Sequence, residues 1–499
     1  MANISKSKYV EFCICNKYSW LSKYKPELIL EESNTTDFTD KGKEVGELAK
    51  GLFKGFVDVT TYDGDSLDIK QMLEKTKDEI NKGTKVICEA AFLYNNAYCA
   101  IDILKKEKTG YSLYEVKSST KLKDSFYTDV AYQKYVVEHC GIKINSCYII
   151  YLNKGYIKNG DLDLDELFNI VDMTDDIQEE YDDVESNIKD YNDIMDNNKE
   201  PDTFLCAESC GGKKECPFWH YCAKDIPEPS VFDLYDMRKN KKFQLYNSGI
   251  VSFEDVHNSN INLSNFQQKQ VDSYMNNLTE IIDKQEIRDF LDKISFPLYF
   301  LDFETMEMPI PEYDGTYPYQ QVPFQYSLHY IEKEGGELKH KEFLAEVGKN
   351  PLRDIAESLC NNIPMDVCVT AYFKKFECTR LAELASIFPE LSEHLLNIKD
   401  HVVDFLDPFK YGYYYNKGFG NSCSIKVVLP TLFPNEPTLD YHNLKGCVHN
   451  GSEAMNIFPQ LKNMTKSEQA EVRESLLRYC ELDTYAMVKV WEELKRVAL

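Results

Sequence analysis

The residues FPLYFLDFET, at 296–305, place two acidic side chains within an apolar run. A short apolar run bounded by polar segments is typical of a buried strand. Asp302 and Glu304 are two positions apart, so in a strand their side chains point to the same face. Charged groups are rarely left unpaired in apolar surroundings. The run therefore predicts a buried strand of an α/β domain, with a chemical role for its two carboxylates.

Possible partners for these acids occur further along the chain. RYCELDTYAM puts Tyr479 and Asp483 four residues apart, on one face of the expected C-terminal helix. VCVTAYFKKFECTRLAEL has the form of a strand, a short loop and a helix, with Glu377 near the start of the helix, and Asp404 in HVVDFLDP is a rival for the same role. Carboxylates can hold two metal ions about 4 Å apart, which activate water and stabilise the leaving oxygen of a phosphodiester.

This combination resembles the DEDD exonucleases of the ribonuclease H-like superfamily, in the version that carries tyrosine. LDFET contains the D-x-E of their first motif, and RYCELDT the Y-x3-D of their third. The resemblance implies Mg²⁺ or Mn²⁺ held by Asp302, Glu304 and Asp483, with Tyr479 positioning the attacking water. The sequence departs from the family at the second motif, where Glu377 stands in place of an aspartate that is one methylene shorter.

A second constellation lies in residues 85–155, whose apolar and polar runs predict a strand hairpin, a third strand, a helix and a strand. Asp102 falls in AYCAIDIL, and Glu115 and Lys117 fall in YSLYEVKSS, with a turn-like KKEKTG between them. A hairpin of this length places Asp102 beside Glu115, and Lys117 shares the face of Glu115. Such a group can bind a divalent ion and stabilise a developing charge. The alternative is an ordinary hairpin with surface charges.

The helix that follows this hairpin contains Gln133, in AYQKYVVEHCG. It resembles the RecB-type motif of the PD-(D/E)XK nuclease superfamily, with Asp102 as the superfamily's Asp, and Glu115 and Lys117 as its E-x-K. The resemblance implies a restriction-endonuclease-like fold, a metal ion on Asp102 and Glu115, and catalytic roles for Lys117 and Gln133. The superfamily often has a further acidic residue on an early helix, for which the candidates are Glu47 and Glu89.

Four of the sixteen cysteines lie close together in CAESCGGKKECPFWHYC, at positions 206, 210, 216 and 222. Closely spaced thiolates suit a zinc ion or an iron–sulfur cluster. The arrangement resembles the iron–sulfur nucleases of the AddB and CRISPR-associated exonuclease type, in which one cysteine before the nuclease core and three after it bind a cluster. The [4Fe–4S] ligands implied are Cys15, Cys210, Cys216 and Cys222, with Cys13 and Cys206 as spares. The zinc alternative uses Cys206, Cys210, Cys216 and Cys222 alone.

The net charge of −26 argues against a nucleic-acid partner, but it is unevenly distributed. Residues 161–200 hold sixteen acidic residues and two lysines, a net of −14, and are expected to form an amphipathic helix exposed on one side. The remaining −12 leaves room for local basic surfaces, and metal-dependent nucleases need carboxylates to hold their metals. The charge lowers the expectation of tight non-specific binding and does not exclude phosphate contacts.

At 499 residues the chain is too long for one compact core, so two or three domains are expected. We predict an α/β chain with a PD-(D/E)XK restriction-endonuclease-like domain and its cysteine cluster at 1–225, a helical connector at 226–290, and a ribonuclease H-like exonuclease domain at 291–499. No apolar run approaches the roughly 20 residues that a membrane span needs. An apolar signal core is also missing from the N-terminus, so we expect a cytoplasmic protein.

The whole chain resembles an uncharacterised bacterial family that joins a RecB-like domain to an exonuclease-like one, through LDFET, VPFQYSLH, GNSCSIKVVLP and the Y-x3-D helix. Lys426, in the third of these stretches, either contacts phosphate or is a surface lysine. The hypothesis is a metal-dependent nuclease, a DNA exonuclease of repair, recombination or defence. DNA is preferred to RNA through the RecB-like half alone, and unwinding would require a helicase partner. The alternatives are an RNA-processing 3′–5′ exonuclease and a nucleic-acid-binding scaffold with one or both sites degenerate.

Overall fold

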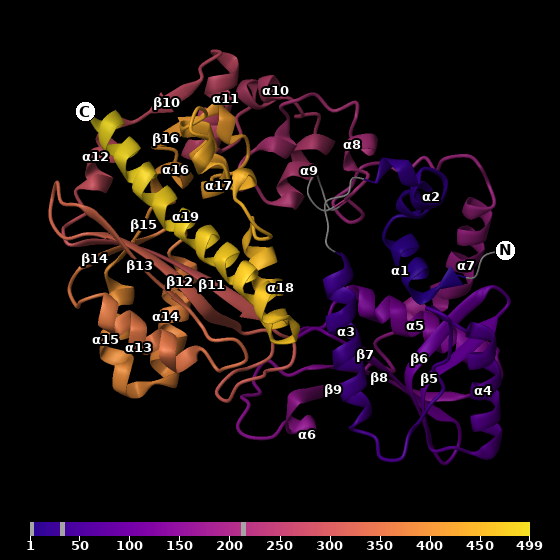
Figure 1. Ribbon diagram of the computed structural model, residues 1–499. Coiled ribbons are helices and arrows are strands. Elements are labelled where there is room, and N and C mark those ends of the chain that lie inside the picture. Colours follow the sequence, from indigo (N-terminus) through magenta and orange to yellow (C-terminus); the bar gives the residue numbers. More distant parts are fainter. Residues whose placement is uncertain (1–3, 30–34, 211–215) are drawn as a thin grey trace. The chain divides into compact units, whose positions relative to one another are not determined.

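The computed structural model describes residues 4–29, 35–210 and 216–499. The chain divides into two compact units, residues 1–225 with 308–320, and residues 226–307 with 321–499. Both units are of the mixed α/β class that the sequence predicted, with mixed parallel and antiparallel sheets (Figure 1). Within the described ranges, no helix combines the length and the apolar character that crossing a membrane requires.

The first unit is built on a seven-stranded sheet of order β2-β5-β6-β7-β8-β9, with β1 paired to β6. The strands of the unit, which include β3 and β4 outside this sheet, are β1 Ile4–Ser5, β2 Val57–Asp58, β3 Tyr62–Asp63, β4 Ser66–Leu67, β5 Val86–Tyr94, β6 Ala97–Lys106, β7 Tyr111–Lys117, β8 Ile144–Leu152 and β9 Phe168–Asp172. Its helices are α1 Lys6–Ile14, α2 Asn16–Tyr24, α3 Thr35–Lys50, α4 Ile69–Lys82, α5 Asp124–His139, α6 Leu164–Leu167, α7 Gln178–Met195 and α8 Trp219–Cys222.

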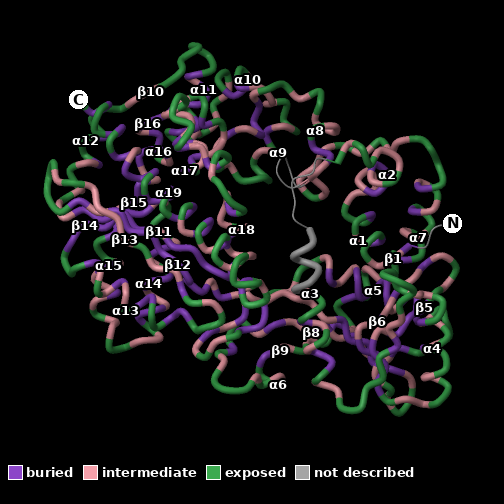
Figure 2. Tube along the Cα trace, viewed as in Figure 1, coloured by how far each residue is buried: buried purple, intermediate pink, exposed green. Residues whose placement is uncertain are grey.

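The centre of this sheet follows the predicted order of hairpin, strand, helix and strand. β5 and β6 are antiparallel and joined by a tight turn, in which Asn95 adopts a φ of +54°, a left-handed conformation that Asn tolerates. β6 pairs antiparallel with β7, and β7 pairs parallel with β8. A parallel pair needs a crossover connection, which α5 provides. Neighbouring residues of β7 point to opposite faces of the sheet and enter different apolar clusters. Leu113 packs in the cluster that contains α5, and Tyr114 packs in the one that contains Phe53, so both faces of the sheet are covered (Figure 2).

The acidic stretch at 161–200 contains more than the single amphipathic helix expected. α7 has that character, since it buries Val184, Tyr191 and Met195 and exposes most of its acids. Before it, the residues FNIVD form β9, which pairs antiparallel with β8 through Ile149 and Val171. Because many acidic residues surround this short run of β-branched residues, the sequence pattern does not indicate a strand there. The run becomes a strand through its pairing with β8.

The second unit is built on a five-stranded sheet of order β13-β12-β11-β14-β15. The strands of the unit, which include β10 and β16 outside this sheet, are β10 Glu280–Ile282, β11 Leu298–Glu307, β12 Gln321–Ile331, β13 Leu338–Leu344, β14 Cys368–Ala371, β15 Val402–Asp404 and β16 Tyr414–Asn416. Its helices are α9 Lys239–Asn247, α10 Phe253–Asn258, α11 Asn265–Met275, α12 Lys284–Leu291, α13 Leu352–Asn362, α14 Lys375–Ile387, α15 Ser392–Asp400, α16 Asp407–Lys410, α17 Ile425–Leu432, α18 Gly451–Gln460 and α19 Lys466–Ala498.

Side chains of β12 show which helices cover each face of this sheet. Gln325 donates to the Leu476 carbonyl of α19 at 2.9 Å, whereas Tyr326 bonds to Ser358 of α13 at 2.7 Å. Because neighbouring residues of a strand point to opposite faces, α19 and α13 lie on different sides of the sheet. α19 is the long yellow helix that crosses β11 and β12 in Figure 1.

Two segments are placed differently from the predicted domain scheme. The residues expected as a separate connector, 226–290, belong to the second unit, where β10 pairs with β16 through Ile281 and Tyr415. Residues 308–320, between β11 and β12, belong to the first unit instead. There the Lys158 backbone bonds to Thr316 and Gly315 at 2.9 and 2.8 Å. These backbone bonds and the burial of Ile310 join the loop to the first unit.

The loop before α18 approaches α19 closely at Gly446, which has a φ of +119°. A Cβ atom at Gly446 would lie 2.3 Å from the Ser475 hydroxyl oxygen. That oxygen also accepts hydrogen bonds from the backbone of Cys447 and Val448, both at 3.0 Å. Glycine is therefore required here, and the loop that it permits leads to the start of α18.

Gly446→Ala should lower the free energy of unfolding by roughly 2–4 kcal/mol, because left-handed strain adds to an overpacked contact. The measurement is chemical denaturation followed by circular dichroism. Gly249→Ala is the matched control: its φ of +78° is also left-handed, but the described residues place no atom within 4 Å of its added Cβ. The control should lose only about 1–2 kcal/mol. Equal losses in the two variants would contradict a specific contact at Gly446.

Candidate functional site

The two acids of β11 lie near the centre of the second unit's sheet. β11 runs between β12 and β14, with Asp302 opposite Ser327 and Glu304 opposite Gln325. Opposite residues point to the same face, so both carboxylates lie on the α19 side. The strand register shifts directly after Glu304, which marks a β-bulge, a feature common beside active sites because it re-aims side chains.

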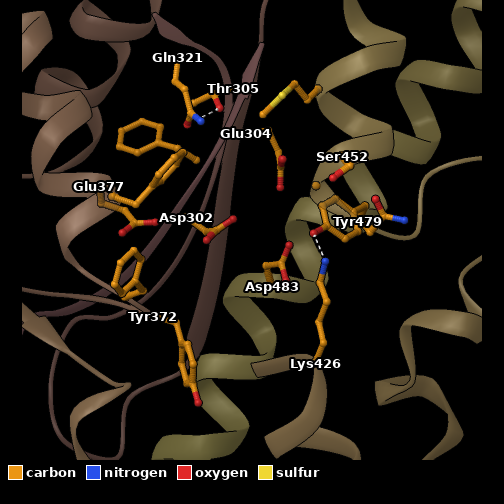
Figure 3. Close-up of a pocket in the computed structure, with 16 residues that line it drawn as sticks. Asp302, Glu304, Thr305, Gln321, Tyr372, Glu377, Lys426, Ser452, Tyr479 and Asp483 are labelled. Carbon is orange, nitrogen blue, oxygen red and sulfur yellow. Dashed lines mark hydrogen bonds between the residues drawn. The ribbon is translucent and has the colours of Figure 1, made fainter. Parts of the chain in front are cut away.

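Two helices add the remaining predicted residues to this face. α19 presents Tyr479 and Asp483 from successive turns, and α14 presents Glu377 from its first turn. These three side chains, Asp302 and Glu304 line one cavity of about 530 Å³. Figure 3 shows the carboxylates directed into it from the strand and from both helices. The structure thus brings together every residue that the sequence assigned to the exonuclease-like site.

Burial raises the pKa of each carboxyl group in this cavity. For Asp302 and Glu304, repulsion from Asp483 adds to burial and keeps the pKa well above the usual value. Burial also raises the pKa of Asp483, and it raises that of Glu377 to about 8. Of the described residues that line the cavity, only Lys426 carries a cationic side chain. The cavity therefore concentrates more negative charge than its protein cation neutralises.

Hydrogen bonds fix the two aromatic hydroxyls beside the acids. Lys426 Nζ donates to the Tyr479 hydroxyl oxygen at 2.8 Å (Figure 3). Because an ammonium group only donates, the Tyr479 hydroxyl keeps its own proton, and it forms a hydrogen bond to Asp483 that favours the charged form of that acid. Tyr441 donates to Asp483 Oδ1 at 2.6 Å. The structure places Lys426 at the cavity, and its contact with phosphate stays a prediction. Tyr441 carried no spacing signal in the sequence and was not foreseen.

The structure distinguishes Glu377 from its rival, Asp404. Asp404 Oδ1 accepts hydrogen bonds from the Phe373 and Leu406 amides, at 2.9 and 3.0 Å, and Asp404 does not line the cavity. Its role is to hold the β14–α14 loop, in which Phe373 has a φ of +74°. Glu377 Oε2 is buried without a hydrogen-bond partner. An acceptor that lacks a partner inside a cavity suits a cation, so Glu377, rather than Asp404, lies with the other acids of the cavity.

The predicted residues of the first unit also form a cluster. Asp102 Oδ2 accepts a hydrogen bond from the Val116 amide at 2.7 Å, which places it beside Glu115. Lys117 Nζ lies 2.8 Å from Glu115 Oε1, and Gln133 donates to Glu115 Oε2 at 2.8 Å. β6, β7 and α5 therefore bring Asp102, Glu115, Lys117 and Gln133 together as the sequence proposed.

Two further residues of this cluster were missed in the sequence. Asp129 on α5 pairs with Lys117 and accepts from Gln133 at 2.9 Å. Lys6 lies 2.7 Å from Glu115 Oε1 and 3.6 Å from Asp102 Oδ1, between the two predicted metal ligands. Asp129 could have been found from its helical spacing of four residues from Gln133. Lys6 could not, because the pairing of β1 with β6 brings it across about 100 positions.

The pKa values of the two acids Asp102 and Glu115 are shifted in opposite directions. Burial and the nearby Glu115 raise the pKa of Asp102 to about 6. Although burial opposes it, Lys117 and Lys6 hold the pKa of Glu115 well below its usual value. In this cluster, the ammonium groups of Lys6 and Lys117 neutralise the charge of the carboxylates. The cavity of the second unit has only Lys426 for that purpose among the described residues that line it.

Of the two candidates for a further acid, Glu89 lies nearer to the cluster. Burial and Asp102 raise the pKa of Glu89 to about 7, and its φ of +56° is strained for a non-glycine residue. Strain of this kind is frequent at functional sites. The side chain of Glu47 is 70% exposed and pairs with Lys50, which also lies 3.7 Å from Glu89. Glu47 therefore connects to the cluster only indirectly.

Cys15 is brought close to the distal cysteines. It lies at the start of α2, and Tyr18 of that helix packs against Phe218 between Cys216 and Cys222. Burial and repulsion from Cys15 raise the pKa values of Cys210, Cys216 and Cys222, that of Cys210 to about 11. Cys15 is therefore near enough to each of the three distal thiols to raise its pKa, and residues 211–215 lie outside the described part of the chain.

The two spare cysteines have other neighbours. Cys206 interacts with Cys210, and its Sγ lies 2.7 Å from the Ser209 hydroxyl oxygen. Cys13 is hydrogen-bonded to Tyr9. The zinc alternative requires Cys206 in place of Cys15, and Cys15 is the thiol that interacts with all three distal ligands.

Comparisons with known proteins match parts of the chain. Residues 299–424 match a family described as a domain of unknown function, DUF2779. Over 208 residues, 38% of its length, the chain is 26% identical to the uncharacterized protein MG366 of Mycoplasma genitalium, and over 213 residues it is 23% identical to the homologue in Mycoplasma pneumoniae. The chain covers about a third of these relatives, 31% of each. The family match includes Asp302, Glu304 and Glu377 and ends before Tyr479 and Asp483.

Glu377→Gln should stabilise the metal-free protein, and the gain should grow as the pH rises. The folded-state pKa of about 8 lies above the usual 4.5, so the folded state binds the extra proton and loses stability between these values. We expect a difference of roughly 4 kcal/mol at pH 8, because the two pKa values differ by about 3.5 and each tenfold change in proton affinity corresponds to about 1.4 kcal/mol. Chemical denaturation in EDTA at pH 5 and pH 8 measures it.

The control for this prediction is Glu393→Gln, which removes an exposed carboxylate of α15. Its free energy of unfolding should follow the wild type at both pH values. Saturating Mn²⁺ should stabilise the wild type more than Glu377→Gln, because a cation neutralises the charge that the variant lacks. If the free energy of unfolding of Glu377→Gln in EDTA changed with pH as much as that of the wild type, a raised pKa of Glu377 would be refuted.

Proposed function

We propose that this protein is a metal-dependent nuclease that hydrolyses phosphodiester bonds at the cavity of its second unit. The observation that carries the proposal is the convergence of four carboxylates, Asp302, Glu304, Glu377 and Asp483, on one cavity with a single lysine. Unpaired buried charge is costly unless it is neutralised or coordinates a metal. A structural role alone gives no reason to gather four such groups at one site.

The chemistry of the donors fits Mg²⁺ or Mn²⁺. All four side chains offer hard oxygen ligands, and Glu377 Oε2 has no protein partner. Bound divalent ions supply an activated water and stabilise the charge of the scissile phosphate and its leaving oxygen. Asp302, Glu304 and Asp483 hold the metals, and Glu377 completes the set from α14.

Tyr479 and Lys426 act beside the carboxylates. The tyrosine hydroxyl accepts from Lys426 at 2.8 Å and retains its own proton for donation. Its hydrogen bond to Asp483 holds it beside the proposed metal ligands, where it would orient a water molecule, and burial together with Asp483 raises its pKa, which keeps it protonated. Lys426 fixes the tyrosine and adds positive charge that attracts a phosphate.

The remaining walls of the cavity suit a nucleic-acid strand. Tyr372, Phe373 and Phe376 line it, and the Phe373 ring is 48% exposed. Aromatic faces stack on bases whatever their sequence. Lys374 and Lys375, which follow Phe373 in the chain, are exposed and able to contact the backbone phosphates. Stacking next to a carboxylate site favours a single-stranded end as the substrate.

The architecture of the second unit supports a ribonuclease H-like assignment. The first acids lie on the central strand, β11, which pairs antiparallel with β12 and parallel with β14. The third motif lies on the C-terminal helix, which packs across that strand. We assign the unit to the DEDD exonuclease type on this arrangement together with the sequence motifs.

We propose a second nuclease site in the first unit, at Asp102, Glu115, Lys117 and Gln133. Its support is the contact of all four side chains within one cluster of a mixed sheet, as a PD-(D/E)XK fold requires. Lys117 is placed to stabilise the developing charge, with Glu115 and Asp129 fixing its position. We further propose a structural [4Fe–4S] cluster on Cys15, Cys210, Cys216 and Cys222, because these thiols interact with one another.

The biological setting rests on the sequence resemblance alone. The RecB-like half favours DNA over RNA and a role in repair, recombination or defence, with a helicase as a partner for unwinding. A cytoplasmic location belongs to the same proposal. The scaffold alternative predicts binding of nucleic acid without hydrolysis, so an activity assay separates the two.

In a Lys117→Ala background, which removes the contribution of the first unit, Asp302→Asn should reduce hydrolysis of end-labelled single-stranded DNA by roughly 10²–10⁴-fold, because a ligand of the metals is lost. The assay compares single- and double-stranded DNA and RNA with Mg²⁺ or Mn²⁺. Lys117→Ala should remove the activity of the first unit, and the double variant all of it. Asp400→Asn, an exposed acid of α15, is the control and should retain full activity. Unchanged activity in both single variants would rule out two working nucleases.

Anaerobically purified protein should contain iron and acid-labile sulfide at about four of each per chain, as a [4Fe–4S] cluster requires. Cys15→Ser should lose the cluster and its visible absorption, whereas Cys140→Ser, an exposed cysteine of the same unit, should keep both. Stoichiometric zinc without iron in the wild type would refute the iron–sulfur assignment.

A further inference from the structure

A second group of metal-ligating side chains lies on the second unit, formed by His329, His340 and Glu481. His329 and His340 are directly opposite each other on β12 and β13, so both rings project from the same face of the sheet. Glu481 lies on α19, which covers that face. One ligand atom from each of the three lies within 4.8 Å of the other two.

Hydroxyl groups of β12 and α19 engage one nitrogen of each ring. His329 Nδ1 lies 2.8 Å from the Thr484 hydroxyl oxygen, and His340 Nε2 lies 2.8 Å from the Ser327 hydroxyl oxygen. The two hydroxyl oxygens are 2.7 Å apart, and Thr484 also donates to the Glu481 carbonyl oxygen at 3.1 Å.

These hydrogen bonds orient each ring through one nitrogen, and the other nitrogens, His329 Nε2 and His340 Nδ1, are left for a ligand. Neither nitrogen has a hydrogen-bond partner in the described part of the chain. Fixing one imidazole nitrogen by a hydrogen bond is how proteins orient histidine ligands toward a metal.

We propose that His329, His340 and Glu481 bind a zinc ion, at a site separate from the carboxylate cavity. Two imidazole nitrogens and one carboxylate, with a water in the fourth position, are a donor set that zinc adopts in proteins. Imidazole donors also select against Mg²⁺, which prefers oxygen ligands. Glu481 is exposed and has no ion pair within the described residues, so it is available to complete the site.

The position of this site gives it a structural consequence. Thr484, which orients His329, directly follows the acid Asp483 on α19. A zinc ion on Glu481 and the two histidines ties α19 to β12 and β13. The site would therefore hold the helix that carries Tyr479 and Asp483, without taking part in the hydrolysis. The inference does not depend on the proposed nuclease activity.

The test measures zinc binding by the untagged full-length chain in an Asp302→Asn background, which weakens competing binding at the carboxylate cavity. After dialysis against limiting zinc, the zinc-to-protein ratio is compared by mass spectrometry. Glu481→Gln and His340→Asn should each bind one zinc fewer per chain than the parent, or bind it at least about tenfold more weakly. Zinc should raise the melting temperature of the parent, and this rise should be smaller in both variants.

His442→Asn provides the matched control, because this histidine is exposed on the same unit and bonds only to the nearby Asp440. It should bind as much zinc as the parent. Zinc held by cysteines is the same in all four proteins and cancels from the comparison. Glu481→Gln changes an exposed residue, so it keeps the test valid if His340→Asn fails to fold. An unchanged ratio in Glu481→Gln, or an equal loss in His442→Asn, would overturn the proposal.

Discussion

Repulsion among buried carboxylates is the constraint on which the second unit depends. Asp302, Glu304, Glu377 and Asp483 face one cavity, and burial raises the pKa of each. The surrounding fold has to hold these groups together with Lys426 as the single cationic side chain among the described residues that line the cavity. It does so with the central strand of a sheet and with α19, whose N-terminus is closed by a capping box between Thr465 and Glu468. Stability given up at such a site is the usual cost of a binding function.

In the first unit, lysine side chains compensate the charge of the buried carboxylates. There Lys6 and Lys117 contact Glu115, and Asp129 balances Lys117, so charges are paired within the protein. A metal ion entering between Asp102 and Glu115 has to displace the Lys6 ammonium, whereas the second unit offers an uncompensated cavity. The two proposed sites should therefore differ in how tightly they bind divalent ions, even though both are built from carboxylates.

Local pattern was sufficient to predict the strands and helices that carry the motifs. Spacings of two in β11 and of four in α19 follow directly from strand and helix geometry, and so do the contacts of Glu115 with Lys117. The sequence could not show Lys6, Tyr441 or the choice between Glu377 and Asp404, since each depends on pairing between distant segments. β9 was missed for the same reason, because a short apolar run acquires its structure only beside β8. Nuclease activity and the iron–sulfur cluster remain predictions that these contacts support.

The loop at 308–320 has a practical consequence for dissecting the protein. It leaves the second unit after β11 and returns at β12, but Ile310 is buried among apolar residues of the first unit, and the Tyr319 hydroxyl lies 2.6 Å from that of Ser118. A truncation at Asp225 therefore yields one fragment without a piece of its core and another with an exposed apolar loop. Neither half of this chain can be isolated intact by a single cut, and inactivity of such a fragment would say nothing about its active site.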